Sequence, residues 1–114
     1  MVGYDGSDAA ERALDAAADL AGYGSTLAVV TVHAGEPDGS TTAAARERLL
    51  RRHIGARFHE TVGEPADALL DKAQELEADL IVLGRRNGGP RSVPIGSVSS
   101  QVVRNARCDV LVVR

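Results

Sequence analysis

The chain has 114 residues and a formal net charge of −3, with 44% apolar and only 3% aromatic residues. This length suits one domain, and we expect residues 1–114 to form a single domain with a core of Ala, Val, Leu and Ile. The sequence shows no apolar run near the roughly 20 residues that a membrane span needs, and no signal-peptide pattern at its start. Its single cysteine, Cys108, excludes an intramolecular disulfide, and its acidic balance argues against general nucleic-acid binding. We therefore expect a cytoplasmic protein.

Short apolar or alternating runs predict five β-strands. They are residues 1–4, 26–32, 56–62, 79–84 and 109–114. The second, fourth and fifth runs are continuously apolar and rich in β-branched residues, as expected of strands that are covered on both faces. The third run alternates between apolar and polar residues, which favours a strand with one exposed face.

The segments between these runs predict helices. Ser7 or Asp8 is suited to cap the first helix, since both side chains can accept hydrogen bonds from backbone N–H groups. The second helix is expected at about 42–53, with Leu49 and Leu50 facing inward. Its four arginines fall mostly on the other side, and we interpret them as a face exposed to solvent.

The third helix has Pro65 near its start, where a missing N–H is tolerated, and the fourth begins near Gly96 or Ser97. Strands and helices that alternate along the whole chain predict an open five-stranded parallel α/β sheet of Rossmann-like type, in the order 3-2-1-4-5, with helices on both faces. The chain reverses its winding direction between the first and fourth strands, and ligands bind at such a point. Asp5 and Gly84 end these two strands.

The positive charge of the chain is concentrated near the predicted switch point. Between Asp79 and Asp109 there are five arginines and no acidic residue, a charge of +5, which leaves 8 basic and 16 acidic residues elsewhere, a charge of −8. A local positive field in an acidic body favours a small anion as a partner. An arginine-rich loop exposed to solvent is the alternative interpretation.

Within this region, residues 84–99 read GRRNGGPRSVPIGSVS and lie between a strand and a helix. Glycines let backbone N–H groups approach an anion, and the start of a helix offers unpaired N–H donors. Gly96, Ser97, Val98 and Ser99 stand at that start, and the two serine hydroxyls can add hydrogen bonds. The segment therefore predicts a phosphate-binding loop.

Two further groups suit a nucleotide at this edge. The Asp5 carboxylate can accept hydrogen bonds from two ribose hydroxyls, and the backbone around Val32 can meet an adenine. The sequence is not a Walker loop, because the only lysine, Lys72, lies in the third helix. It also lacks a GxGxxG pattern after the first strand.

Three blocks of the sequence resemble the universal stress protein family. They are VGYDGSDAAERALDAAADLA, GEPADALLDKAQELEADLIVLGRR and IGSVSSQVVRNARCDVLVVR, in the family's order and at about its distances. The resemblance covers nearly the whole chain and implies the fold described above, a role in the stress response and, in one branch, ATP binding. It also implies a homodimer through the last strand, 109–114, whose apolar edge would otherwise be exposed.

The ATP-binding branch of the family carries a loop with the pattern G-x2-G-x9-G-[ST]. By this resemblance Gly84 is its first glycine, Gly96 and Ser97 are its closing pair, Asp5 contacts the ribose, and the backbone of Val32 meets the adenine. The ligand implied is ATP, with or without Mg²⁺, or else ADP or AMP.

The loop is one residue shorter than the family pattern, so two alignments of its second glycine remain open. Either Asn87 takes that position, since asparagine tolerates a left-handed backbone, or Gly88 does with the gap shifted. Pro90 and Pro94 also stand in a stretch that is usually aliphatic in the family, and Pro94 lacks an N–H donor.

The sequence supports one main function and two alternatives. The main interpretation is a stress-response binding module for an adenine nucleotide. The shortened loop favours a dimeric protein-interaction module without ATP, and the third possibility, a weak nucleotide hydrolase, lacks an assignable general base. The three histidines, at 33, 53 and 59, show no metal-ligand spacing, and Cys108 is expected to be a packed structural thiol.

Overall fold

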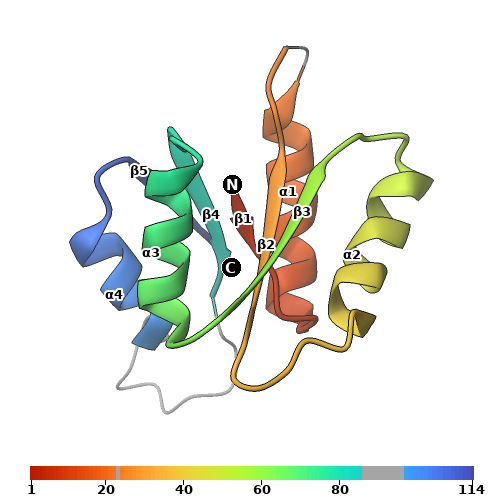
Figure 1. Ribbon diagram of the computed structural model, residues 1–114. Coiled ribbons are helices and arrows are strands. Elements are labelled where there is room, and N and C mark those ends of the chain that lie inside the picture. Colours follow the sequence, from red (N-terminus) through yellow and green to blue (C-terminus); the bar gives the residue numbers. More distant parts are fainter. Residues whose placement is uncertain (23, 86–96) are drawn as a thin grey trace.

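The structure is a computed structural model that describes residues 1–22, 24–85 and 97–114. Strands and helices alternate along the chain (Figure 1). The elements are β1 (Val2–Gly3), α1 (Asp8–Ala21), β2 (Ala28–His33), α2 (Ser40–Arg51), β3 (Arg57–Val62), α3 (Pro65–Glu75), β4 (Leu80–Gly84), α4 (Ser97–Asn105) and β5 (Asp109–Val113). The strands are parallel and lie in the order β3-β2-β1-β4-β5, which confirms the predicted sheet.

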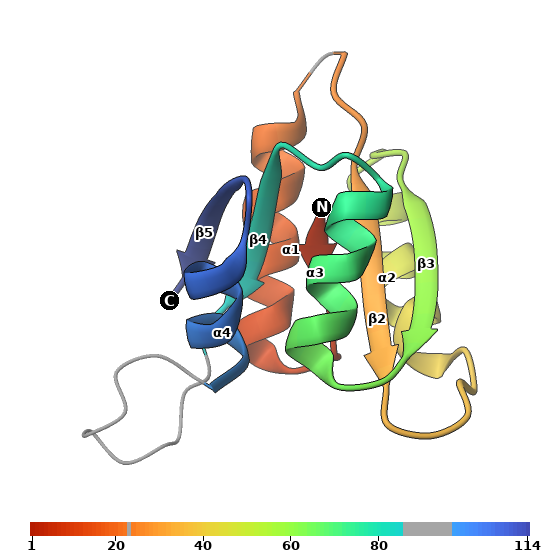
Figure 2. The same ribbon diagram turned by 60° about the vertical axis from the view of Figure 1, so that its left-hand side comes forward.

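The sheet has a helical layer on each face, with α1 and α2 on one side and α3 and α4 on the other (Figure 2). Successive strand residues point to opposite faces, so each central strand supplies both layers. In β2, Val29 packs in a cluster with Leu14 and Leu49, whereas Val30 packs in a second cluster with Leu69 and Val102. This double burial explains the apolar character of β4 and of most of β2. The expectation that the fifth strand is covered on both faces was wrong, since β5 lies at the edge of the sheet and its residues are half-buried or exposed.

The first strand is shorter than its apolar run suggested. Residues 1–4 were expected, but β1 comprises only Val2–Gly3, and the last described backbone bond from this segment to β2 is donated by Tyr4 N–H to the Val30 carbonyl at 2.9 Å. The chain then turns through Gly6, whose φ of +84° is a conformation that glycine adopts without strain. The central strand of the sheet therefore ends before its neighbour β2.

Helix α2 differs from the prediction in its start and in its rotation. It begins at Ser40 because the Asp38 carboxylate accepts hydrogen bonds from the Ser40 N–H, at 2.9 Å, and hydroxyl, at 2.8 Å. The expectation that Leu50 faces inward was wrong, since its exposed fraction is 65% while that of Leu49 is 1%. Thr42 lies seven residues before Leu49 and shares its buried face, whereas Leu50 is turned about 100° away.

Arg48 of α2 and Arg52, which directly follows the helix, tie α2 to α1, although the sequence predicted that these arginines form a face exposed to solvent. Arg48 makes two hydrogen bonds with the Asp15 carboxylate, at 2.8 and 2.7 Å, and its Nη1 lies 2.8 Å from a Glu11 oxygen. Arg52 pairs with Asp19 one turn further along. The acidic partners are about 33 residues away in sequence, so helix periodicity alone does not reveal them.

Within the described ranges of the chain, no helix is long and apolar enough to cross a membrane.

Candidate functional site

A cleft of about 340 Å³ opens at the carboxyl edge of the sheet, where β1 and β4 end. In Figure 1 this is the lower edge, where α1, α3 and α4 also begin. Among the described residues, its walls are mainly apolar and include three alanines and the larger side chains Val30, Val32, Pro65, Leu69, Leu83 and Val98. Cofactor sites commonly combine such walls with a few convergent polar groups. The volume is at the lower end of the usual range for small-molecule sites, about 300–1,000 Å³.

Asp5 supplies the carboxylate of the cleft. Its Oδ1 accepts a hydrogen bond from the Ser7 N–H at 2.9 Å, which orients the carboxylate after the short β1 strand. Ser7 caps α1 by accepting from the Ala10 N–H at 3.1 Å, as one of the two predicted caps. The Asp5 side chain is thus held at one oxygen while it remains exposed to the cleft, an arrangement suited to accept from a diol.

Val32 presents backbone groups to the cleft. Residues two apart on a parallel strand direct their N–H and C=O groups to the same neighbouring strand. The backbone groups of Val30 are directed toward β1, because its carbonyl accepts a hydrogen bond from the Tyr4 N–H. The backbone groups of Val32 are directed to the same side, beyond the end of β1. His33 faces the other way and accepts from the Gly63 N–H at 3.2 Å. The Val32 N–H and C=O are therefore directed into the space that β1 leaves open.

Gly84 brings the end of β4 against the first turn of α1. A Cβ added at this position would lie 2.2 Å from the Ala9 carbonyl oxygen and 2.9 Å from the Ala9 Cβ. Helix and strand approach so closely that only a glycine fits between them. This glycine therefore has a packing role in addition to the phosphate-loop role that the sequence predicts for it.

The described start of α4 closes one side of the cleft. Val98 is half-buried, and Ser99 is buried with an exposed fraction of 5%; both line the cleft. The Ser99 hydroxyl donates a long hydrogen bond of 3.5 Å to the Gly84 carbonyl, which directs its proton toward β4. Ser97 is the first residue of α4, while Asn87, Gly88 and Gly96 lie outside the described residues.

Tyr4 is a cleft residue that the sequence interpretation missed. Its ring is buried at the end of β1, and its hydroxyl donates to a Glu11 carboxylate oxygen at 2.8 Å. Burial raises the pKa of the Tyr4 phenol well above its usual value, and the hydrogen bond to the Glu11 carboxylate acts in the same direction. The only signal in the sequence was a tyrosine directly before the strand-ending Asp5.

The histidines and the cysteine were also placed by the structure. No group of three or more His, Cys, Asp or Glu side chains that suits a metal occurs in the described part of the chain. His33 ends β2 with its Nε2 3.5 Å from a Glu60 oxygen, and its side chain is 14% exposed. Cys108 is half-buried beside the α3 and α4 layer, where it packs with apolar residues.

Comparisons with known proteins agree on one family. A family model described as "Universal stress protein family" matches residues 1–114. A universal stress protein of Thermus aquaticus is 36% identical over 132 residues, covering 100% of this chain and 96% of that protein. A solved universal stress protein from Archaeoglobus fulgidus has a TM-score of 0.83 and 30% identity, covering 99% of this chain and 96% of that one.

A related structure was solved with a ligand bound. It is a universal stress protein solved in complex with cAMP, with a TM-score of 0.78 and 28% identity to this chain. The match covers 99% of this chain and 94% of the related one.

Proposed function

The chain belongs to the universal stress protein family, and from that membership and the cleft we propose that it binds an adenine nucleotide as a cytoplasmic stress-response module. The observation that carries the proposal is the break in backbone pairing at Val32. Its N–H and C=O face an apolar cleft and match the donor and acceptor pair that an adenine edge requires. The relative solved with cAMP supports an adenine mononucleotide as the ligand class.

The other parts of the nucleotide then have defined partners. The adenine would lie between the walls formed by Val30 and Leu69, and the ribose hydroxyls would donate to the free side of the Asp5 carboxylate. The phosphates would extend toward the start of α4, where backbone N–H groups are available. The sequence pattern that begins at Gly84 supports ATP, with or without Mg²⁺, with ADP and AMP as alternatives.

The test is isothermal titration of the purified, nucleotide-stripped protein with ATP and Mg²⁺, ATP alone, ADP, AMP and cAMP. We expect saturable binding near one site per chain for at least one of them. The Asp5→Asn variant should bind about tenfold more weakly, because it weakens a charge-assisted hydrogen bond to the ribose. Asp8→Asn is the matched control, since Asp8 begins α1 and is exposed but does not line the described cleft.

The opposite result has an equally definite meaning. If none of the nucleotides produces heat or raises the melting temperature, the nucleotide proposal fails. The protein would then be interpreted as an interaction module. A phosphate-release assay on the same samples tests the weak-hydrolase alternative directly.

A second proposal concerns the oligomeric state. The two sheet edges differ in charge, because β3 carries Arg57 and Glu60 beside its exposed Val62, whereas β5 is apolar after Asp109 and exposes Leu111, at 38%. Charged side chains protect an edge strand from pairing, and apolar edges favour it. We propose a homodimer formed by antiparallel pairing of residues 109–114. Light scattering should show a dimer that Leu111→Lys dissociates and that Val62→Lys, on the β3 edge, leaves intact.

A further inference from the structure

A polar cluster lies behind the β2 wall of the cleft, on the face covered by α2. At its centre the Glu60 Oε1 accepts a hydrogen bond from the Thr42 hydroxyl at 2.7 Å and lies 3.5 Å from the His33 Nε2. Thr42 is buried, and the Glu60 and His33 side chains are 30% and 14% exposed. One carboxylate, carried by β3, therefore contacts the last residue of β2 and the first turn of α2.

His33 connects this cluster to the cleft. It stands between Val32 and Ala34, and both of these residues line the cleft. Because side chains alternate along a strand, the His33 ring points toward α2 while the Val32 side chain points toward α3. A contact that holds the His33 ring therefore also fixes the backbone on the other side of the strand, where the Val32 N–H and C=O face the ligand space.

The end of β2 has few other attachments. The described backbone bonds from the β1 side end at Val30, so beyond that residue β2 is held by β3 alone and by its side chains. Thr31 pairs directly with Glu60 across the ladder and is buried, with a hydroxyl that has no hydrogen-bond partner in the described chain. On the α2 face the Glu60 carboxylate accepts from Thr42 and lies 3.5 Å from the His33 Nε2, which has no hydrogen-bond partner in the described chain, so this is the polar group that the ring approaches at the end of β2.

From this geometry we infer that Glu60 is a positioning residue for the cleft, although it does not line it. It fixes the segment Val32–Ala34 through His33 and anchors that segment to α2 through Thr42. The inference rests on the proposed nucleotide binding. It assigns to the α2 face a part in ligand affinity that a map of cleft-lining residues would not include.

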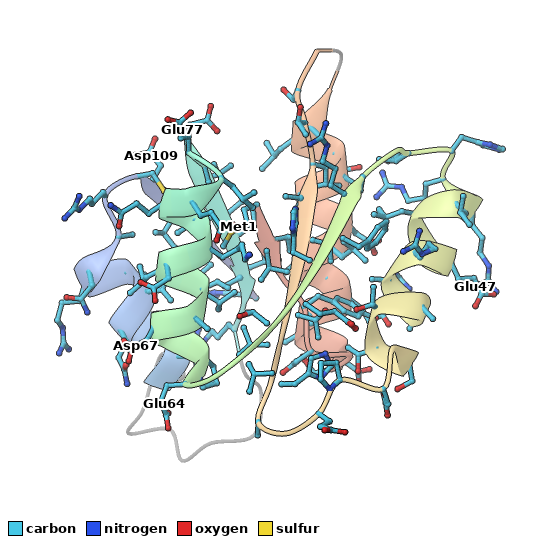
Figure 3. All side chains as sticks on the ribbon, in the orientation of Figure 1. Met1, Glu47, Glu64, Asp67, Glu77 and Asp109 are labelled. Carbon is cyan, nitrogen blue, oxygen red and sulfur yellow. The ribbon has the colours of Figure 1, made fainter. Side chains whose placement is uncertain are left out.

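The experiment compares three variants by isothermal titration with the nucleotide that binds best to the wild type. Glu60→Ala removes both contacts, and we expect affinity to fall about tenfold with the stoichiometry unchanged. Glu60→Gln keeps an acceptor for the Thr42 hydroxyl and a polar group facing His33, so it should recover most of the affinity. Glu64→Ala is the control, because Glu64 lies at the same edge of the sheet, at the start of α3 (Figure 3), and should bind as the wild type.

A second measurement does not depend on the ligand. Amide hydrogen exchange in the unliganded protein should be faster at His33 and Gly63, which pair the ends of β2 and β3, in Glu60→Ala than in the wild type, and close to the wild type in Glu60→Gln. Amides in the core of β4, such as Ile81, should not change. This pattern separates local positioning from a general loss of stability.

The outcomes distinguish the two proposals. A wild type that binds no nucleotide refutes the proposed function, and the affinity part of this inference falls with it. A wild type that binds, together with a Glu60→Ala variant of equal affinity, overturns the role of Glu60 alone. Equal losses in Glu60→Ala and Glu60→Gln, or unchanged exchange at His33 and Gly63, also overturn it.

Discussion

Replacing Gly84 with alanine would place a Cβ 2.2 Å from the carbonyl oxygen and 2.4 Å from the carbonyl carbon of Ala9. To reach an ordinary separation, the end of β4 and the first turn of α1 must move apart by about 1 Å. Overpacking that flexible side chains cannot relieve costs about 3 kcal/mol, the upper part of the usual range. For a chain of this length we therefore expect the melting temperature to fall by about 12 °C.

The assay is urea unfolding followed by circular dichroism, with thermal melts of the same samples. Gly3→Ala is the matched control, because its Cβ would meet the ends of the Leu83 and Leu69 side chains at 2.8 and 3.2 Å, and these can rotate away. We expect that variant to lose about 1 kcal/mol or less. Adding Ala9→Gly to Gly84→Ala should not restore stability, since the obstruction is the main chain. The reasoning is refuted if Gly84→Ala is within about 0.5 kcal/mol of the wild type.

Three further predictions concern the α1 and α2 face. Burial raises the pKa of Tyr4, so the stability that its neutral phenol provides is present below about pH 10 and is lost as the pH rises further. Tyr4→Phe should lower the free energy of unfolding by about 1 kcal/mol at pH 7. In urea unfolding at alkaline pH, this variant should not show the loss of stability that the wild type shows. The Arg48 hydrogen bond lowers the pKa of Asp15, so the stability that this pair provides is present above about pH 4 and is lost as the pH falls. Arg48→Met should cost at most about 1 kcal/mol of stability at pH 7, because both side chains are more than a third exposed. In acid the variant and the wild type should have the same stability toward urea. Leu49→Ala should cost about 2–5 kcal/mol and Leu50→Ala less than about 0.5 kcal/mol in chemical unfolding, and the reverse order would contradict the observed rotation of α2.

The fold was predictable because its signals are local and repeated. The mainly apolar runs of β2 and β4 reflect burial on both faces, and their alternation with helices leaves few possible topologies. The rotation of α2 was not predictable, because two adjacent leucines do not indicate which of them faces the sheet. Thr42, a polar residue, occupies the buried face and offers no apolar signal.

From the sequence, the candidate site could be predicted only at residues that end or directly follow a predicted strand. Asp5 and Val32 follow apolar runs, and the structure places both at one cleft, although their contacts with a nucleotide remain a prediction. The Glu60 contacts join residues 18 or more positions apart, which no periodic pattern links. The tight contact between Gly84 and Ala9 likewise arises from the distance between a helix and a strand. These contacts depend on how closely the helices pack against the sheet, which the sequence pattern does not indicate.

The early end of β1 also has a consequence for how this protein tolerates variation. The groups proposed to recognise the adenine at Val32 belong to the main chain, so nearly every amino acid at that position would present the same N–H and C=O to the cleft. Proline is the exception, because it lacks the N–H. A saturation scan scored for ligand capture should therefore find position 32 permissive except to proline and to side chains too large for the wall. Such a site can be preserved through long evolutionary drift while leaving little trace in the identity of its residues.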